Sequence, residues 1–178
     1  MFRQTDPKWK DTTMTDPSDL PKLEDKEKLL RWGKKGKDTL GRFGCLVTAL
    51  TNAHNYYYSE VRTPEWFNQK LRDNDGYYVL RDGYDCLVGQ ESFIDWEVAK
   101  KVFGFKAFKD VETRIVDILD EHRYYIARVP YNPPSIMSGH YNLIVGNKDG
   151  IRHFDSDTGA IRTDWGKHPN YRVIEILF

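Results

Sequence analysis

The amino-acid sequence predicts an α+β fold in which a group of helices precedes a separate antiparallel sheet. Apolar residues recur at helical spacing through the first two thirds of the chain and alternate with polar residues through the last third. The chain has 178 residues and no internal repeat, which is typical of one domain with a core of its own. We therefore expect a single domain over residues 1–178.

The helical half should contain several elements with recognisable ends. Thr63 and Pro64 are a typical N-cap and first helical residue. Ser92 should cap a helix that Gly104 ends, because glycine adopts the left-handed conformation of a helix C-terminus. The expected helices are 45–56, 64–71, 92–103, 111–121 and a surface helix ending near Gly33 within the charged insertion 22–38.

The last third of the chain should form the sheet. The expected strands are 124–129, 141–146, 151–155 and 171–177. Irregular structure is expected in the N-terminal segment 1–20, the acidic loop 73–90, the proline-rich loop 130–138 and a turn at 147–150.

Composition excludes several classes of function. The 27 basic residues balance 27 acidic ones, so no net charge attracts the protein to nucleic acid or to a membrane surface. Spacings typical of zinc sites or glycine-rich phosphate loops are missing, so no metal or cofactor is expected. No signal peptide or membrane-spanning segment is recognisable. The expected location is therefore the cytoplasm, a virion, or wherever another delivery route takes the protein.

Cys45 is the leading candidate for a reactive residue. It follows Gly44 and begins the apolar helical segment 45–56. The partial positive charge of a helix N-terminus favours a thiolate there, and the glycine leaves the sulfur uncrowded. The plainer alternative is a buried helix cysteine that acts as a small hydrophobe. Cys86 lacks such a setting and is expected to be structural.

A histidine and a carboxylate complete the pattern. His140 precedes an expected strand, and Asp155 and Asp157 close the next one. If the two strands form a hairpin with a two-residue turn, alternation places all three side chains on one side of the sheet. This reasoning leaves open which aspartate orients the histidine. Each residue alone could have an ordinary structural role, but the order Cys–His–Asp favours a nucleophile, a base and an orienting acid.

The chain resembles the papain-like cysteine peptidases that are akin to the double-glycine leader peptidases, which mature bacteriocins. Residues 4–10 are similar to the opening Gln-x-Asp-Pro-x-Trp segment of that family. Residues 44–50 are similar to its nucleophile helix, 96–104 to its Trp-x-x-x-Ala helix and 139–146 to its base strand. Asp155 stands where the family's Asp-Pro motif has the orienting acid.

The resemblance implies a papain-like cysteine peptidase fold, with the nucleophile helix of a helical half packed on a C-terminal antiparallel sheet. It implies that Cys45, His140 and Asp155 form the triad and that Gln4 serves the oxyanion hole. The expected activity is hydrolysis of peptide bonds in a peptide or protein.

Three departures from the family pattern concern the substrate and the acid. Ser156 replaces the usual proline, the segment 22–38 is inserted, and the loop 73–90 is enlarged. Substrate selection would be built on the last two segments, so the family's substrate is not carried over. The alternatives are a hydrolase of peptide cross-links in bacterial cell walls and a silent peptide-binding module. Oligomeric state is not predicted.

Overall fold

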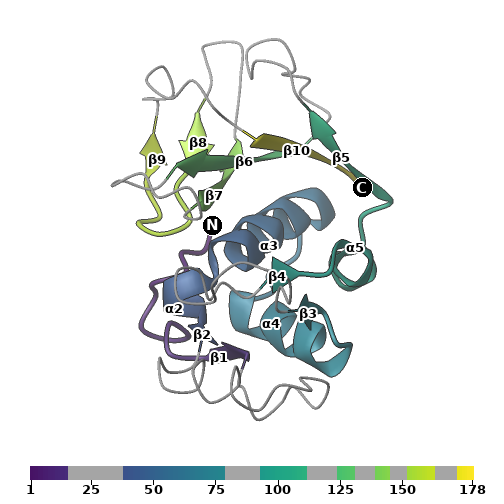
Figure 1. Ribbon diagram of the computed structural model, residues 1–178. Helices are drawn as coiled ribbons and strands as arrows, with labels where there is room; N and C mark the ends of the chain where they lie inside the picture. The colour runs from purple at the N-terminus through teal and green to yellow at the C-terminus, as the bar shows by residue number, and fades with distance from the viewer. Residues whose placement is uncertain (16–37, 79–92, 112–123, 131–138, 145–151, 163–171) are drawn as a thin grey trace, which may run out of the picture.

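The fold places a six-stranded antiparallel sheet over a group of helices, as the computed structural model shows (Figure 1). An α+β fold is thus confirmed. The structure describes residues 1–15, 38–78, 93–111, 124–130, 139–144, 152–162 and 172–178. Among these residues, no helix is both long and apolar enough to cross a lipid bilayer.

The helices agree with most of the expected ones. They are α2 (Leu40–Phe43), α3 (Cys45–Tyr58), α4 (Pro64–Asp73) and α5 (Trp96–Phe103). The Thr63 side chain accepts a hydrogen bond of 3.2 Å from the Trp66 backbone N–H, as expected of the N-cap of α4. Gly104 ends α5 with a φ of 74°, as its left-handed role requires.

The predicted start of α5 was wrong. Asp95 caps this helix, because its carboxylate accepts hydrogen bonds from the backbone N–H groups of Glu97 and Val98 at 2.9 and 3.1 Å. Residues 93–94 lie outside the helix. They form β4 (Phe93–Ile94), which pairs with β3 (Tyr77–Tyr78) at the start of the expected acidic loop.

The sheet has the strand order β5-β10-β6-β7-β8-β9. Its strands are β5 (Ala107–Val111), β6 (Tyr124–Pro130), β7 (Gly139–Ile144), β8 (His153–Phe154), β9 (Ile161–Arg162) and β10 (Arg172–Leu177). The four expected strands correspond to β6, β7, β8 and β10, although β7 begins two residues earlier and β8 is shorter. The edge strands β5 and β9 were not predicted.

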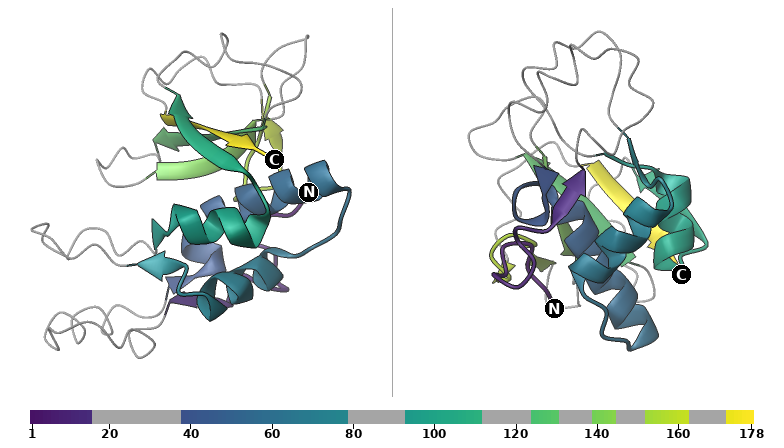
Figure 2. Two further views of the ribbon diagram at one scale, coloured as in Figure 1. Left: turned by 90° about the vertical axis from the view of Figure 1, so that its right-hand side faces the viewer. Right: turned by 90° about the horizontal axis from the view of Figure 1, so that it is seen from below.

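Helix α3 forms the centre of the molecule. It contacts β6 and β7 on one side and α4 and α5 on the other (Figures 1 and 2). Every residue from Leu46 to Ala53 is buried, which suits a helix covered on all sides. The largest fully buried side chains around it are Phe67, Phe103, Met14, Leu40, Leu50, Leu71, Ile126, Leu143, Ile174 and Ile176. Each such side chain stabilises the fold by roughly 1.5–3 kcal/mol through removal from water.

Several predictions fall wholly or partly outside the described residues. The surface helix of segment 22–38 and the turn 147–150 lie outside them, as do residues 131–138 of the expected loop and Cys86, whereas Pro130 belongs to β6. The predicted helix over 111–121 is described at its first residue only, and Val111 there belongs to β5. A short strand pair, β1 (Thr13–Thr15) with β2 (Asp38–Thr39), flanks the charged insertion.

Candidate active site

Cys45 is the first residue of the central helix α3. It is a free, half-buried cysteine. Gly44 both ends α2 and precedes α3, and its backbone N–H donates to the Leu40 carbonyl at 2.8 Å. A Cβ atom at Gly44 would lie 2.8 Å from the Leu40 Cα, so this sharp junction requires glycine. The junction leaves the sulfur at the positive end of a 14-residue helix.

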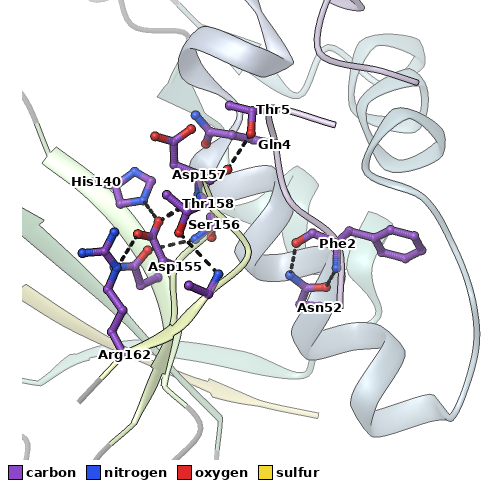
Figure 3. Close-up of polar contacts among 12 residues, drawn as sticks. Phe2, Gln4, Thr5, Asn52, His140, Asp155, Ser156, Asp157, Thr158 and Arg162 are labelled. Atoms are coloured by element: carbon purple, nitrogen blue, oxygen red, sulfur yellow. Dashed lines mark hydrogen bonds and ion pairs between the residues drawn. The ribbon is translucent and has the colours of Figure 1, made fainter. Parts of the chain in front are cut away.

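His140 lies near the start of β7, the strand against which α3 packs. Its ring is buried, and Nε2 donates to Asp155 Oδ1 at 2.9 Å (Figure 3). Of the two candidate carboxylates, it is that of Asp155 that the structure brings into hydrogen-bond contact with His140. Because Asp155 occupies Nε2, the ring nitrogen left for the Cys45 sulfur is Nδ1.

The hairpin register explains this contact. Leu143 is opposite Phe154, and Ile144 is opposite His153, so even positions pair with odd ones as expected for a two-residue turn. Side chains alternate along each strand, so His140 and Asp155 project to the same side. Strand β6 fixes the other edge of β7, with Val129 opposite His140.

The electrostatic environment favours a charged ring. Burial alone would lower the pKa of His140, but hydrogen bonds with Asp155 and Cys45, and the negative charge of both groups, outweigh it. The result is a pKa raised to about 10. Burial would raise the pKa of Asp155, yet the hydrogen bond from His140 and that from the Asp157 backbone hold it well below its usual range. The pair is thus an imidazolium next to a carboxylate at neutral pH.

Asp155 accepts hydrogen bonds from other groups in addition to His140. Oδ1 also accepts from the backbone N–H of Asp157 at 2.9 Å and of Thr158 at 3.4 Å. Oδ2 accepts from Arg162 Nε at 2.9 Å, and Figure 3 shows the carboxylate between His140 and Arg162. These contacts fix the rotation of the carboxylate and present Oδ1 to the ring.

Sequence reasoning missed Arg162. It belongs to β9, a two-residue strand whose pattern is too short to recognise. The signal that could have found it is the turn after Asp155, where Gly159 has a φ of 76°. A hairpin around this turn places Arg162 opposite His153, and hence on the same side as Asp155.

Gln4 is buried although it lies near the N-terminus of the chain. Its backbone N–H donates to the Ser156 carbonyl at 2.7 Å, next to the acid. Its side-chain Nε2 donates to the Gly41 carbonyl at 3.2 Å, four residues before Cys45. This bond uses one of the two hydrogens on Nε2, and the other has no acceptor among the residues that the structure describes. Gln4 therefore connects the turn that carries Asp155 with the segment that precedes Cys45.

The N-terminal segment is tied to the domain at two further places. Trp9 is buried in the core, and its indole N–H donates to the Arg3 carbonyl at 2.9 Å. The Phe2 backbone exchanges hydrogen bonds of 2.7 and 2.9 Å with the Asn52 side chain on α3 (Figure 3). The Asn52 contacts were not predicted, because a polar residue in the middle of an apolar helix carries no signal of its partner.

The arrangement suits acyl transfer by a sulfur nucleophile. The His140 imidazolium lies between the Cys45 sulfur and the anchored Asp155 carboxylate, and the Gln4 amide is hydrogen-bonded to the segment just before Cys45. Within the described part of the chain, no group of three or more His, Cys, Asp or Glu side chains could hold a metal ion. Comparisons with protein-family models, with curated proteins and with solved structures find no match to this chain.

Proposed function

We propose that the protein is a thiol peptidase that hydrolyses peptide bonds with Cys45, His140 and Asp155. The observation that carries the proposal is the His140 ring between two partners, with Asp155 on Nε2 and the Cys45 sulfur close enough to raise its pKa. A histidine that served only to fill the core would not need a carboxylate with three further donors behind it.

The first half of the reaction forms an acyl-enzyme. The Cys45 thiolate attacks the carbonyl carbon and forms the carbon–sulfur bond, which gives a tetrahedral oxyanion. The oxyanion collapses and breaks the carbon–nitrogen bond while Nδ1 of His140 gives its proton to the leaving amine. Asp155 keeps the ring oriented throughout.

Water completes the cycle. Neutral His140 takes a proton from a water molecule as the water oxygen attacks the thioester carbon. Breakage of the carbon–sulfur bond then releases the carboxylic acid and regenerates the thiolate with the imidazolium. The raised pKa of His140 supports its role as the proton donor in the first half, because the ring stays protonated at neutral pH.

Gln4 and the start of α3 would stabilise the oxyanion. The second hydrogen of Gln4 Nε2 and the backbone N–H of Cys45 are the proposed donors, since the first N–H groups of a helix lack partners within that helix. One such donor is typically worth about 10²–10³ in rate. The hydrogen bond from Gln4 to Gly41 supports the proposal, because it holds the amide beside the helix start.

We further propose that the α+β fold is of the papain-like type. The nucleophile begins a helix that packs on an antiparallel sheet, and the base lies at the start of a strand of that sheet. The resemblance to papain-like cysteine peptidases implies this same arrangement, with a helical half packed on a C-terminal antiparallel sheet.

The test uses two kinds of substrate. The protein is incubated with peptide libraries and with purified bacterial cell walls, and the products are identified by mass spectrometry. We expect new peptide termini with the wild type and none with Cys45→Ala. Release of wall peptides without cleavage of any library peptide would favour the alternative function, hydrolysis of peptide cross-links in bacterial cell walls. Tight peptide binding without products would support the silent binding module and contradict the peptidase.

A further inference from the structure

Asp157 has a carboxylate that the triad does not use. Its backbone N–H and His140 Nε2 both lie 2.9 Å from the same oxygen, Asp155 Oδ1. The two nitrogens are therefore within about 6 Å of each other, two hydrogen-bond lengths at most. Asp157 is thus adjacent to the proposed base although it does not orient it.

The backbone of Asp157 is also fixed on its other side. The Thr5 hydroxyl donates to the Asp157 carbonyl at 2.6 Å, and the preceding residue accepts from the Gln4 backbone at 2.7 Å. In Figure 3 the Asp157 carboxylate points to the side of the turn away from Arg162. The residue therefore lies between the proposed base and the proposed oxyanion donor.

The Asp157 side chain is half-buried and makes no hydrogen bond or ion pair within the part of the chain that the structure describes. Arg162, on the strand that follows the turn, pairs with Asp155 instead. Arg3 packs against Gly159 of the same turn but forms no ion pair with Asp157. The backbone of Asp157 is thus fixed beside the proposed base, while its carboxylate lacks an ion-pair partner among the described residues.

Such a carboxylate works against the reaction unless the substrate compensates it. Acylation places negative charge on the carbonyl oxygen, and a nearby carboxylate disfavours that charge. A cation on the substrate would neutralise Asp157 and gain a charge-assisted hydrogen bond. Neutral and acidic substrates therefore incur this electrostatic cost during acylation, and basic substrates do not. The arrangement would make the enzyme selective for basic substrates.

We propose that Asp157 binds a cationic group of the substrate, an ammonium or guanidinium close to the scissile bond. This inference rests on the proposed peptidase function and names its substrate class as peptides with a basic residue or a free amine beside the cleaved bond. We expect a preference of about tenfold in kcat/KM for a basic over a neutral residue of the same length, which equals about 1.4 kcal/mol.

The test compares matched peptides that carry lysine, norleucine or glutamate next to the bond that the wild type cleaves. The wild type should prefer lysine over norleucine about tenfold. Asp157→Asn should bring this ratio close to one, and Asp157→Lys should reverse it in favour of glutamate. Glu97→Gln, at an exposed residue of α5, removes the same charge and should keep the wild-type ratio.

The outcomes separate the two proposals. Cysteine-dependent cleavage with an unchanged lysine preference in Asp157→Asn would overturn the role of Asp157 and leave the peptidase intact. Absence of cleavage by the wild type on every peptide would overturn both. Circular dichroism of each variant checks that Asp157→Asn retains the fold, as expected because both turn contacts of this residue use its backbone.

Discussion

Replacement of Asp155 by asparagine tests the electrostatics of the site without changing its shape. The asparagine oxygen can keep the position of Oδ1, with its hydrogen bonds from His140, Asp157 and Thr158. The new amide group would then face Arg162, whose side chain is 45% exposed and can turn into solvent. The main loss is therefore the negative charge beside the His140 ring.

The size of the effect follows from that charge. A hydrogen bond to a charged group contributes about 1.5–3 kcal/mol, which corresponds to about 1–2 pKa units. Asp155→Asn should therefore lower the pKa of His140 from about 10 to roughly 8 or 9, with Cys45 still present as the second partner.

The same shift predicts how stability depends on pH. The folded pKa of His140 is raised above its ordinary value of 6.5, so its contribution is complete below that pH and is lost as the pH rises toward 10. The pKa of Asp155 is lowered, so its contribution is present above about 3.8 and is lost in acid. The pair should stabilise the fold most between these two ordinary values, and Asp155→Asn should remove that maximum.

Nuclear magnetic resonance titration of the histidine rings measures the pKa directly. The His140 signal is assigned by its loss in His140→Asn, and Asp157→Asn is the matched control. Urea unfolding of wild type and Asp155→Asn at two pH values gives the stability. If His140 in the wild type titrates near its ordinary value, or if Asp155→Asn leaves its titration unchanged, the ion pair is refuted.

Three further predictions concern the nucleophile, the oxyanion donor and the helix junction. Iodoacetamide should alkylate Cys45 much faster than Cys86 at about pH 6, because a helix N-terminus and an imidazolium favour the thiolate; equal rates by peptide mapping would count against this. Gln4→Ala should slow acylation about 10²–10³-fold while changing the unfolding free energy by only about 1 kcal/mol, because loss of the bond to Gly41 is partly offset by removal of a buried Oε1 that has no hydrogen-bond partner among the described residues; unchanged pre-steady-state kinetics would remove Gln4 from the site. Gly44→Ala should destabilise the protein by about 1–3 kcal/mol in urea unfolding, because its Cβ would meet the Leu40 backbone; an unchanged midpoint would show that the junction relaxes.

Local signals made most of the helical half predictable. Helix α4 has a side-chain cap at Thr63, and helix α3 follows a glycine and has apolar residues at helical spacing, so tertiary contacts are not needed to recognise them. The prediction that α5 starts after Ser92 was wrong, because residues 93–94 pair with β3 instead of joining the helix. Strand β5 was missed because it is an edge strand whose partner, β10, lies more than 60 residues later in the chain.

The candidate site was predictable to the extent that it depends on order and alternation. The positions of Cys45 and His140 and the shared side of His140 and Asp155 follow from a helix start and a hairpin. The choice between Asp155 and Asp157 could not be made, because both have the same parity and only the turn geometry separates them. Arg162 was missed because its role depends on that same turn.

The most direct test of the account is peptide hydrolysis in water enriched with a heavy oxygen isotope. After cleavage by the wild type, mass spectrometry should find the heavy oxygen in the new carboxyl terminus, because water breaks the Cys45 thioester. Cys45→Ala should give no product, and His140→Ala should give very little. Products that form equally with Cys45→Ala, or that lack the heavy isotope, would contradict a hydrolase with Cys45 as its nucleophile.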